Sequence, residues 1–93
     1  MLELIKARCG IARQITVYDS EIHSYIEDCK KDMEASGVPA RLIQNQDERV
    51  ITAATCFVKA YLGNDRSDTD KYLELYRQRV FRLTLEGDDG LVG

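Results

Sequence analysis

Three cysteines and one histidine are the side chains best suited to chemistry, and their spacing forms no reactive or metal-binding motif. Cys9, Cys29 and Cys56 are widely separated, with no Cys-x-x-Cys or Cys/His ligand pattern around them, which argues against a structural zinc site. We expect three reduced, mostly buried thiols in a cytosolic chain. His23 lies among charged residues of a predicted helix, where we expect a solvated imidazole rather than a shielded general base.

The acidic residues and the glycines are explained by helix surfaces and helix ends. The acidic stretch 65–70 lacks the spacing, the central Gly and the terminal Glu of an EF-hand, so helix capping is the better interpretation. Gly10, Gly37 and Gly63 fall at expected helix ends rather than in a phosphate-binding loop. We therefore predict no enzymatic activity, no bound metal and no cofactor.

The length and composition of the chain are typical of one small globular domain. The chain has 93 residues, of which 44% are hydrophobic and 31% charged, a balance typical of folded proteins rather than disordered ones. Its net charge of −3 argues against a domain whose main task is to grip nucleic-acid phosphates. The apolar run 50–62 is shorter than the about twenty residues that a membrane-spanning helix needs, so we expect no membrane contact.

The hydrophobic periodicity predicts an all-α fold, a small bundle of about four helices with a short flexible C-terminal tail. We divide the chain into a helical domain over residues 1–85 and a flexible acidic tail over residues 86–93. The apolar residues of the connection 11–18 are expected to tuck under the core, and the loop 38–46 to contain a short turn. The predicted helices cover residues 2–9, 19–36, 48–62 and 68–85.

The helix over residues 48–62 is predicted to lie at the centre of the bundle. On a helical wheel its apolar arc is about 240° wide, so it must contact several neighbours. The helices before and after it each have an apolar face of their own. The predicted core consists of Ile22, Ile26, Cys29, Met33, Val50, Ala54, Phe57, Tyr61, Leu73, Tyr76 and Val80.

A second apolar face on the helix over residues 68–85 predicts contact with another chain. Leu75, Phe81 and Leu85 point away from the face that carries Tyr76 and Val80, and a group of exposed apolar residues favours an interface. Arginine is enriched at interfaces. The predicted interface consists of Leu75, Phe81 and Leu85 with a rim of Arg77, Arg79 and Arg82.

Two long segments of the chain resemble the phage head–tail connector family, whose members are often labelled DNA packaging proteins. They are YDSEIHSYIEDCKKDMEASGVP, residues 18–39, and ITAATCFVKAYLGNDRSDTDKYLELYRQRVFRL, residues 51–83. The similarity runs from the first helix to about Leu85, and the turn Tyr61–Arg66 is its most distinctive part. The resemblance covers size, element order and residue types and includes no catalytic signature.

The resemblance implies a structural virion protein of a tailed phage or prophage. Such a protein assembles as a homo-oligomeric ring of roughly twelve copies beneath the portal protein, completes the head and extends the DNA channel. It then docks a stopper or tail-completion protein, while the packaged DNA passes through without sequence-specific binding. Its location would be the bacterial host cytoplasm before assembly and the connector at the portal vertex of the virion afterwards.

Two other functions fit the residues without the resemblance. The first is a small helical DNA-binding regulator that would read DNA through Arg77, Arg79 and Arg82. The second is an adaptor that would bind one host protein through the same apolar patch.

Overall fold

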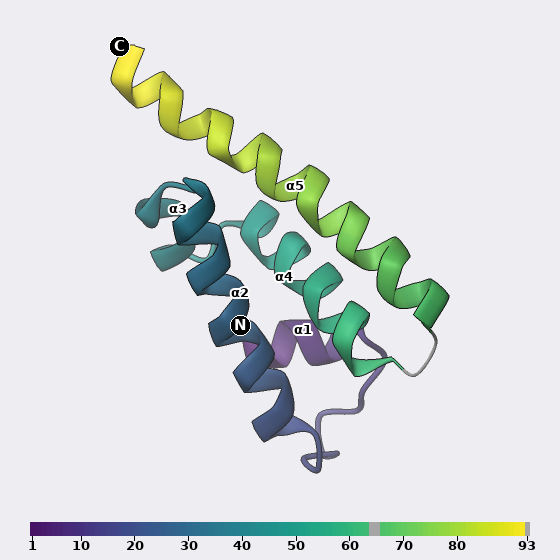
Figure 1. The fold of residues 1–93 in the computed structure, drawn as a ribbon. Helices are drawn as coiled ribbons and strands as arrows, with labels where there is room; N and C mark the ends of the chain where they lie inside the picture. Colours follow the sequence, from purple (N-terminus) through teal and green to yellow (C-terminus); the bar gives the residue numbers. More distant parts are fainter. Residues whose placement is uncertain (64–65, 93) are drawn as a thin grey trace.

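The structure, a computed structural model, describes the backbone of residues 1–63 and 66–92 and the side chains of residues 1–63 and 67–86. Within these ranges the chain forms helices and no strand, which confirms the predicted all-α class. Figure 1 shows the arrangement. The helices are α1 (Leu2–Arg8), α2 (Asp19–Ser36), α3 (Ala40–Gln44), α4 (Glu48–Leu62) and α5 (Arg66–Val92).

The helices lie close to where the periodicity predicts them, with two differences. The described chain has five helices rather than about four, because the short turn expected in the loop 38–46 is the separate helix α3. Helix α5 does not end at Leu85, and its backbone continues to Val92. The side chains of residues 87–93 and the turn residues 64–65 lie outside the described residues, so the flexible tail and its boundary stay predictions.

The ends of α2 and α4 follow from local sequence signals. Asp47 accepts a hydrogen bond of 2.9 Å from the backbone N–H of Arg49, which satisfies one of the free donors at the start of α4. Gly37 ends α2 with a φ of 102°, in the left-handed region that glycine adopts without strain. The N–H of Val38 then bonds to the carbonyl of Met33, which completes the usual glycine-terminated helix end.

Helix α4 occupies the centre of the molecule, as predicted. It packs against α1, α2 and α5, and Figure 1 shows it between α2 and α5 with α1 crossing near its C-terminal end. Ala53 and Ala60 are buried and share the α5 side of α4 with Arg49, which binds Glu86 of α5. Small side chains on this side let the two helices lie close together.

Most of the predicted core residues are buried, and Tyr61 is the clear exception. Phe57 and Leu73 are half-buried, and Tyr61 is 46% exposed, so its assignment to the core is wrong. Tyr61 lies where α2, α4 and α5 leave an open groove instead of closing on one another. The remaining predicted core residues are buried: Ile22, Ile26, Cys29, Met33, Val50, Ala54, Tyr76 and Val80.

Among the described residues, no helix combines the length and the apolar composition that crossing a bilayer requires.

Candidate functional site

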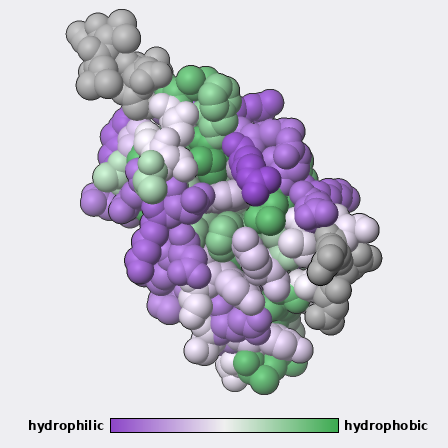
Figure 2. All heavy atoms as spheres, viewed as in Figure 1, coloured by the Kyte–Doolittle hydropathy of each residue, from purple (hydrophilic) through white to green (hydrophobic). Residues whose placement is uncertain are grey.

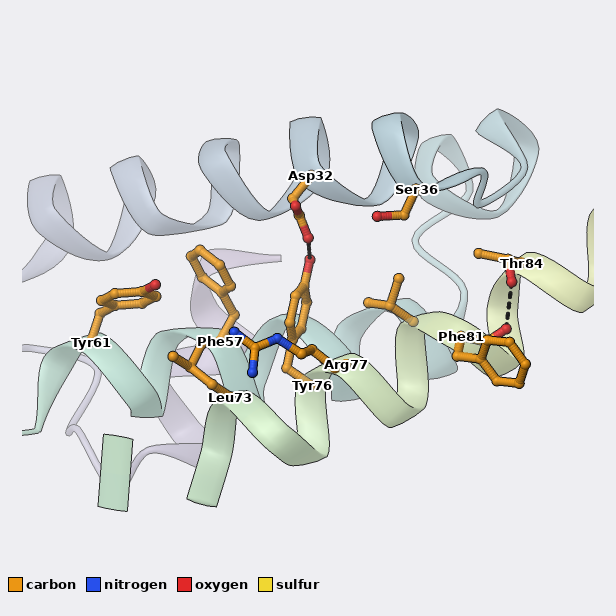
Figure 3. A pocket seen from close by; sticks show the side chains of 10 residues that line it. Asp32, Ser36, Phe57, Tyr61, Leu73, Tyr76, Arg77, Phe81 and Thr84 are labelled. Carbon is orange, nitrogen blue, oxygen red and sulfur yellow. Dashed lines mark hydrogen bonds between the residues drawn. The ribbon is translucent and has the colours of Figure 1, made fainter. Parts of the chain in front are cut away.

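A groove lies between α2, α4 and α5 on the described part of the chain. Its volume is about 610 Å³, within the range of small-molecule and cofactor sites. Figure 3 shows Asp32 and Ser36 projecting from α2 toward α5, above the aromatic residues of α4 and α5. The groove is lined by Asp32, Ser36, Phe57, Tyr61, Leu73, Tyr76, Arg77, Val80, Phe81 and Thr84.

A row of tilted and edge-on aromatic rings forms the floor of the groove. The ring centroid of Phe57 lies 4.9 Å from that of Tyr61 and 5.1 Å from that of Tyr76. Tyr25 of α2 extends the row, with its centroid 5.7 Å from that of Tyr61. These separations are typical of favourable aromatic pairs. These rings lie between α2, α4 and α5, and part of their apolar surface is open to solvent.

One hydrogen bond spans the groove between α5 and α2. The hydroxyl of Tyr76 donates to Oδ2 of Asp32 over 2.6 Å, as drawn in Figure 3. Burial, and then this hydrogen bond, raise the pKa of Tyr76 well above its usual value. Burial likewise raises the pKa of the Cys29 thiol to about 12. Both groups therefore stay protonated near neutral pH, and neither supplies a nucleophile or a general base.

The predicted interface on α5 does not form one patch. Phe81 is 64% exposed and lines the groove together with Arg77. Leu75 is half-buried and lies about 120° from Phe81 around the helix, so the two side chains belong to different surfaces. Leu85 is 48% exposed; it lies one turn beyond Phe81, about 40° from it around the helix, and does not line the groove. The predicted interface residues thus lie on two surfaces of α5, one with Leu75 and one with Phe81, and their role in an interface stays a prediction.

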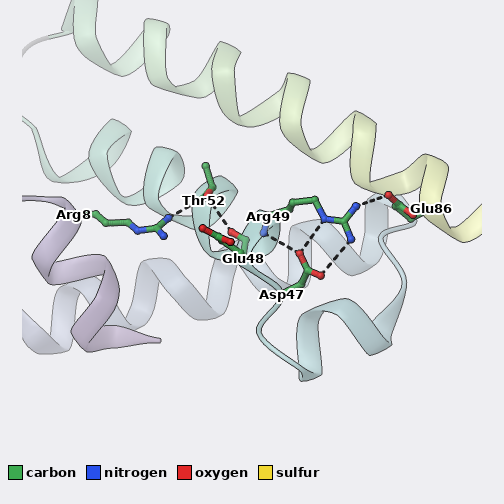
Figure 4. Close-up of polar contacts among 6 residues, drawn as sticks. All are labelled: Arg8, Asp47, Glu48, Arg49, Thr52 and Glu86. Atoms are coloured by element: carbon green, nitrogen blue, oxygen red, sulfur yellow. Dashed lines mark hydrogen bonds and ion pairs between the residues drawn. The ribbon is translucent and has the colours of Figure 1, made fainter.

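The predicted arginine rim is divided in the same way. Arg79 and Arg82 lie on the flank of α5 opposite the groove, around a second hollow of about 290 Å³ that also includes Arg49 and Glu86. Arg49 donates to both carboxylate oxygens of Asp47, at 3.0 and 3.2 Å, and to Glu86, as Figure 4 shows. These bonds from Arg49 lower the pKa of Asp47. This flank therefore ties the start of α4 to α5.

A buried lysine, which the analysis of the sequence missed, holds the segment between α1 and α2. The side chain of Lys6 is 1% exposed, and its ammonium forms a 2.8 Å ion pair with Asp19. It also donates to the carbonyls of Arg13, at 3.1 Å, and Ile15, at 2.7 Å. These three partners match the three N–H donors of an ammonium group. Lys6 falls four residues after Leu2, on the apolar stripe of α1, and that position was the signal for its burial.

The segment held by Lys6 is exposed rather than tucked under the core. Ile15 is 44% exposed and Val17 is 77% exposed, so their predicted burial is wrong; Ile11 is half-buried against the core. Tyr18, next in the chain, is 44% exposed. Figure 2 shows hydrophobic atoms at the lower end of the molecule, where Figure 1 places the connection between α1 and α2. We call residues 15–18 the apolar loop.

The remaining chemistry-bearing residues form no metal centre among the described residues. No group of three or more His, Cys, Asp or Glu side chains there could hold a metal ion. His23 is exposed on α2, while Cys9 and Cys56 are half-buried. Residue 65, the first of the acidic stretch 65–70, lies outside the described residues. The candidate site is the open groove with aromatic rings on its floor.

Comparison with known protein families matches residues 1–90 to the family described as "Phage connector protein". No curated protein and no solved structure matches the chain.

Proposed function

The chain belongs to the phage connector protein family, and from this membership we propose that it is a head–tail connector that works as a ring. The family is a structural one, which implies a component of the virion. In our proposal roughly twelve copies form a closed ring under the portal protein. The ring completes the head, extends the DNA channel and docks a stopper or tail-completion protein.

The family match over residues 1–90 is the observation that carries this proposal. Exposed apolar side chains support it, because a monomer gains nothing from leaving them in water. Phe81 is 64% exposed and Val17 is 77% exposed, and burying such a side chain fully is worth about 1.5–3 kcal/mol. Contacts with neighbouring copies, the portal or the tail would recover part of that free energy.

Passage of DNA without sequence-specific binding is part of the proposal. The net charge of −3 disfavours adhesion of the DNA backbone to the ring. The division of the arginines also disfavours the alternative of a DNA-binding regulator. Arg77 lines the groove, whereas Arg79 and Arg82 lie on the other flank of α5, so they do not form the single basic face of a recognition helix. A salt-dependent titration with duplex DNA tests this point.

The proposal is tested in infected or induced cells that lack the chain. We expect heads that package DNA but then lose it and fail to join tails, and a plasmid copy of the chain should restore infectious particles. Mass spectrometry of purified particles should detect the chain, and electron microscopy should place it between portal and tail. Normal infectious particles without the chain would refute a connector role and favour the host-protein adaptor.

The proposed path of the chain runs from the bacterial host cytoplasm, where it is made, to the portal vertex. Fractionation during infection tests the first part, because unassembled chains should occur free of membranes and heads before packaging is complete.

A further inference from the structure

We propose that the apolar loop of one copy inserts into the aromatic groove of the next copy and so forms the contact between ring neighbours. This inference rests on the proposed function, since it requires self-assembly. It goes further by assigning the two surfaces that meet. The occupant of the groove is therefore a second copy of this chain.

The groove has the form of a receiving surface. It is a hollow of about 610 Å³ with aromatic rings on its floor, and no described part of the same chain fills it. Phe81 at one end and Tyr61 at the other are 64% and 46% exposed. Exposed aromatic side chains in a concave site are typical of the residues that dominate binding energy at interfaces.

The apolar loop has the form of an inserting surface. Ile15, Val17 and Tyr18 are three exposed apolar or aromatic residues within a stretch of four. The buried ammonium of Lys6 fixes the adjoining backbone through the carbonyl of Ile15 and the carboxylate of Asp19. A loop fixed in one conformation loses little entropy on binding. In our proposal the buried ammonium of Lys6 therefore holds the apolar loop in the conformation that binds the groove.

The length of α2 separates the apolar loop from the Ser36 and Phe81 end of the groove in the same copy. The loop precedes the first residue of α2, and the Ser36 end of the groove lies at the last. The 18 residues of α2 span about 27 Å at 1.5 Å per residue. A loop therefore cannot reach the Phe81 end of its own groove. Two different, complementary patches on one chain produce a head-to-tail contact, which closes into a ring when the rotation allows it.

The groove carries one carboxylate, Asp32, and one guanidinium, Arg77, and the proposed contact uses the carboxylate. Arg13 is the only charged residue between Gly10 and Tyr18, and its side chain is 86% exposed in an ion pair with Glu3 at 3.3 Å. Such an exposed pair contributes little and can be exchanged. The α2 wall of the groove carries the Asp32 carboxylate, one oxygen of which accepts the bond from Tyr76. In our proposal the other oxygen accepts the guanidinium of Arg13 from the neighbouring copy.

The first test compares self-association of purified variants, alone and mixed with the portal protein, by sedimentation velocity. Val17→Asp and Phe81→Glu change exposed side chains and should keep helical circular dichroism and thermal stability. Each should weaken ring formation at least tenfold, which corresponds to about 1.4 kcal/mol. Leu4→Asp is the matched control, because Leu4 is 50% exposed on α1 and lines no part of the groove.

The second test detects the contact directly. In a chain with Cys9→Ala and Cys56→Ala, copies carrying Val17→Cys are mixed with copies carrying Ser36→Cys and are assembled under mild oxidation. We expect a disulfide-linked dimer from this mixture. Glu34→Cys replaces Ser36→Cys in the control, because Glu34 is exposed at the same end of α2 but does not line the groove.

The outcomes separate this inference from the proposed function. Rings that form normally in Val17→Asp and Phe81→Glu, without the disulfide between positions 17 and 36, would overturn the loop-in-groove contact alone. Loss of portal binding in Phe81→Glu but not in Val17→Asp would make the portal the occupant and would also overturn it. A wild-type chain that forms no ring, even with the portal present, would overturn both proposals.

Discussion

The helical bundle and the segment between α1 and α2 are held in place by different means. The bundle depends on many apolar contacts spread over α2, α4 and α5, with Ile22, Met33, Val50 and Val58 fully buried. The segment 10–18 has few such contacts, and the ammonium of Lys6 bonds to two of its carbonyls and to Asp19 just beyond it. The core thus consists of many apolar contacts, whereas this segment is held mainly by the polar contacts of one side chain.

The difference also shows what each kind of contact provides. Apolar burial supplies most of the folding free energy but sets orientation only through packing. A buried ion pair adds little net stability, because desolvation offsets most of the attraction. It does require one geometry, and here that geometry presents Ile15 and Val17 to solvent. The helical bundle therefore supplies most of the stability, and the contacts of Lys6 set the conformation of the apolar loop.

The largest effect is expected in the bundle. Met33 is fully buried, and Met33→Ala should lower the free energy of unfolding by about 2–5 kcal/mol, through lost burial and the cavity left behind. The total free energy of unfolding of such a domain is only about 5–15 kcal/mol. Urea titration measures the loss, with Leu4→Ala at an exposed position as the control. A loss below about 1 kcal/mol would mean that α2 is not packed as described.

Replacement of Lys6, which anchors the segment between α1 and α2, should have the second-largest effect on stability. Lys6→Met keeps a similar volume but leaves the Asp19 carboxylate and two carbonyls without their donor. We expect a loss of about 3 kcal/mol, the lower end for a broken buried pair, because the Asp19 side chain is 30% exposed. Amide hydrogen exchange should accelerate in residues 11–18 more than in α4. Equal acceleration throughout would show that Lys6 supports the whole fold rather than this segment.

The aromatic floor of the groove should be less costly to alter than the interior. Phe57 is half-buried, so Phe57→Ala should cost about 2 kcal/mol, below the about 3–5 kcal/mol typical of a buried aromatic. Thermal unfolding followed by circular dichroism provides the measurement. A loss as large as that of Met33→Ala would place the groove energetically within the core.

The hydrogen bond across the groove should contribute about 1 kcal/mol. Tyr76→Phe removes the hydroxyl that donates to Asp32 and keeps the ring, so only the net value of one hydrogen bond is lost. Tyr72→Phe is the control, because its ring meets the ammonium groups of Lys59 and Lys71 through its face. Equal urea midpoints for the two variants would contradict a role for the Asp32 bond.

The smallest effect is expected at Leu85 of α5. Leu85 is 48% exposed and lies outside the groove, so Leu85→Glu should change the free energy of unfolding by less than about 0.5 kcal/mol. It should also leave ring formation unchanged, unlike Phe81→Glu. Weaker assembly in Leu85→Glu would instead support the prediction from the sequence that Leu85 and Phe81 belong to one interface on α5.

The positions of the helices could be predicted because their signals are local. Asp47 before α4 and Gly37 after α2 mark helix ends through bonds within a few residues, and the apolar arc of α4 records that several neighbours surround it. Tyr61 and Phe81 could not be placed in this way. Their exposure depends on how far apart α2 and α5 lie, which no pattern within either helix records.

The sequence by itself determined an all-α chain with α4 at its centre, and its resemblance pointed to the family that the match over residues 1–90 shows. Only the tertiary structure decided which surfaces face outward. It divided α5 into a groove flank with Phe81 and an arginine flank with Arg82, and it buried Lys6 beneath an exposed loop. The physical reason is the range of the interactions. Periodicity and capping act within one helix, whereas the bond from Tyr76 to Asp32 joins residues 44 positions apart, and such contacts exist only once the helices have packed.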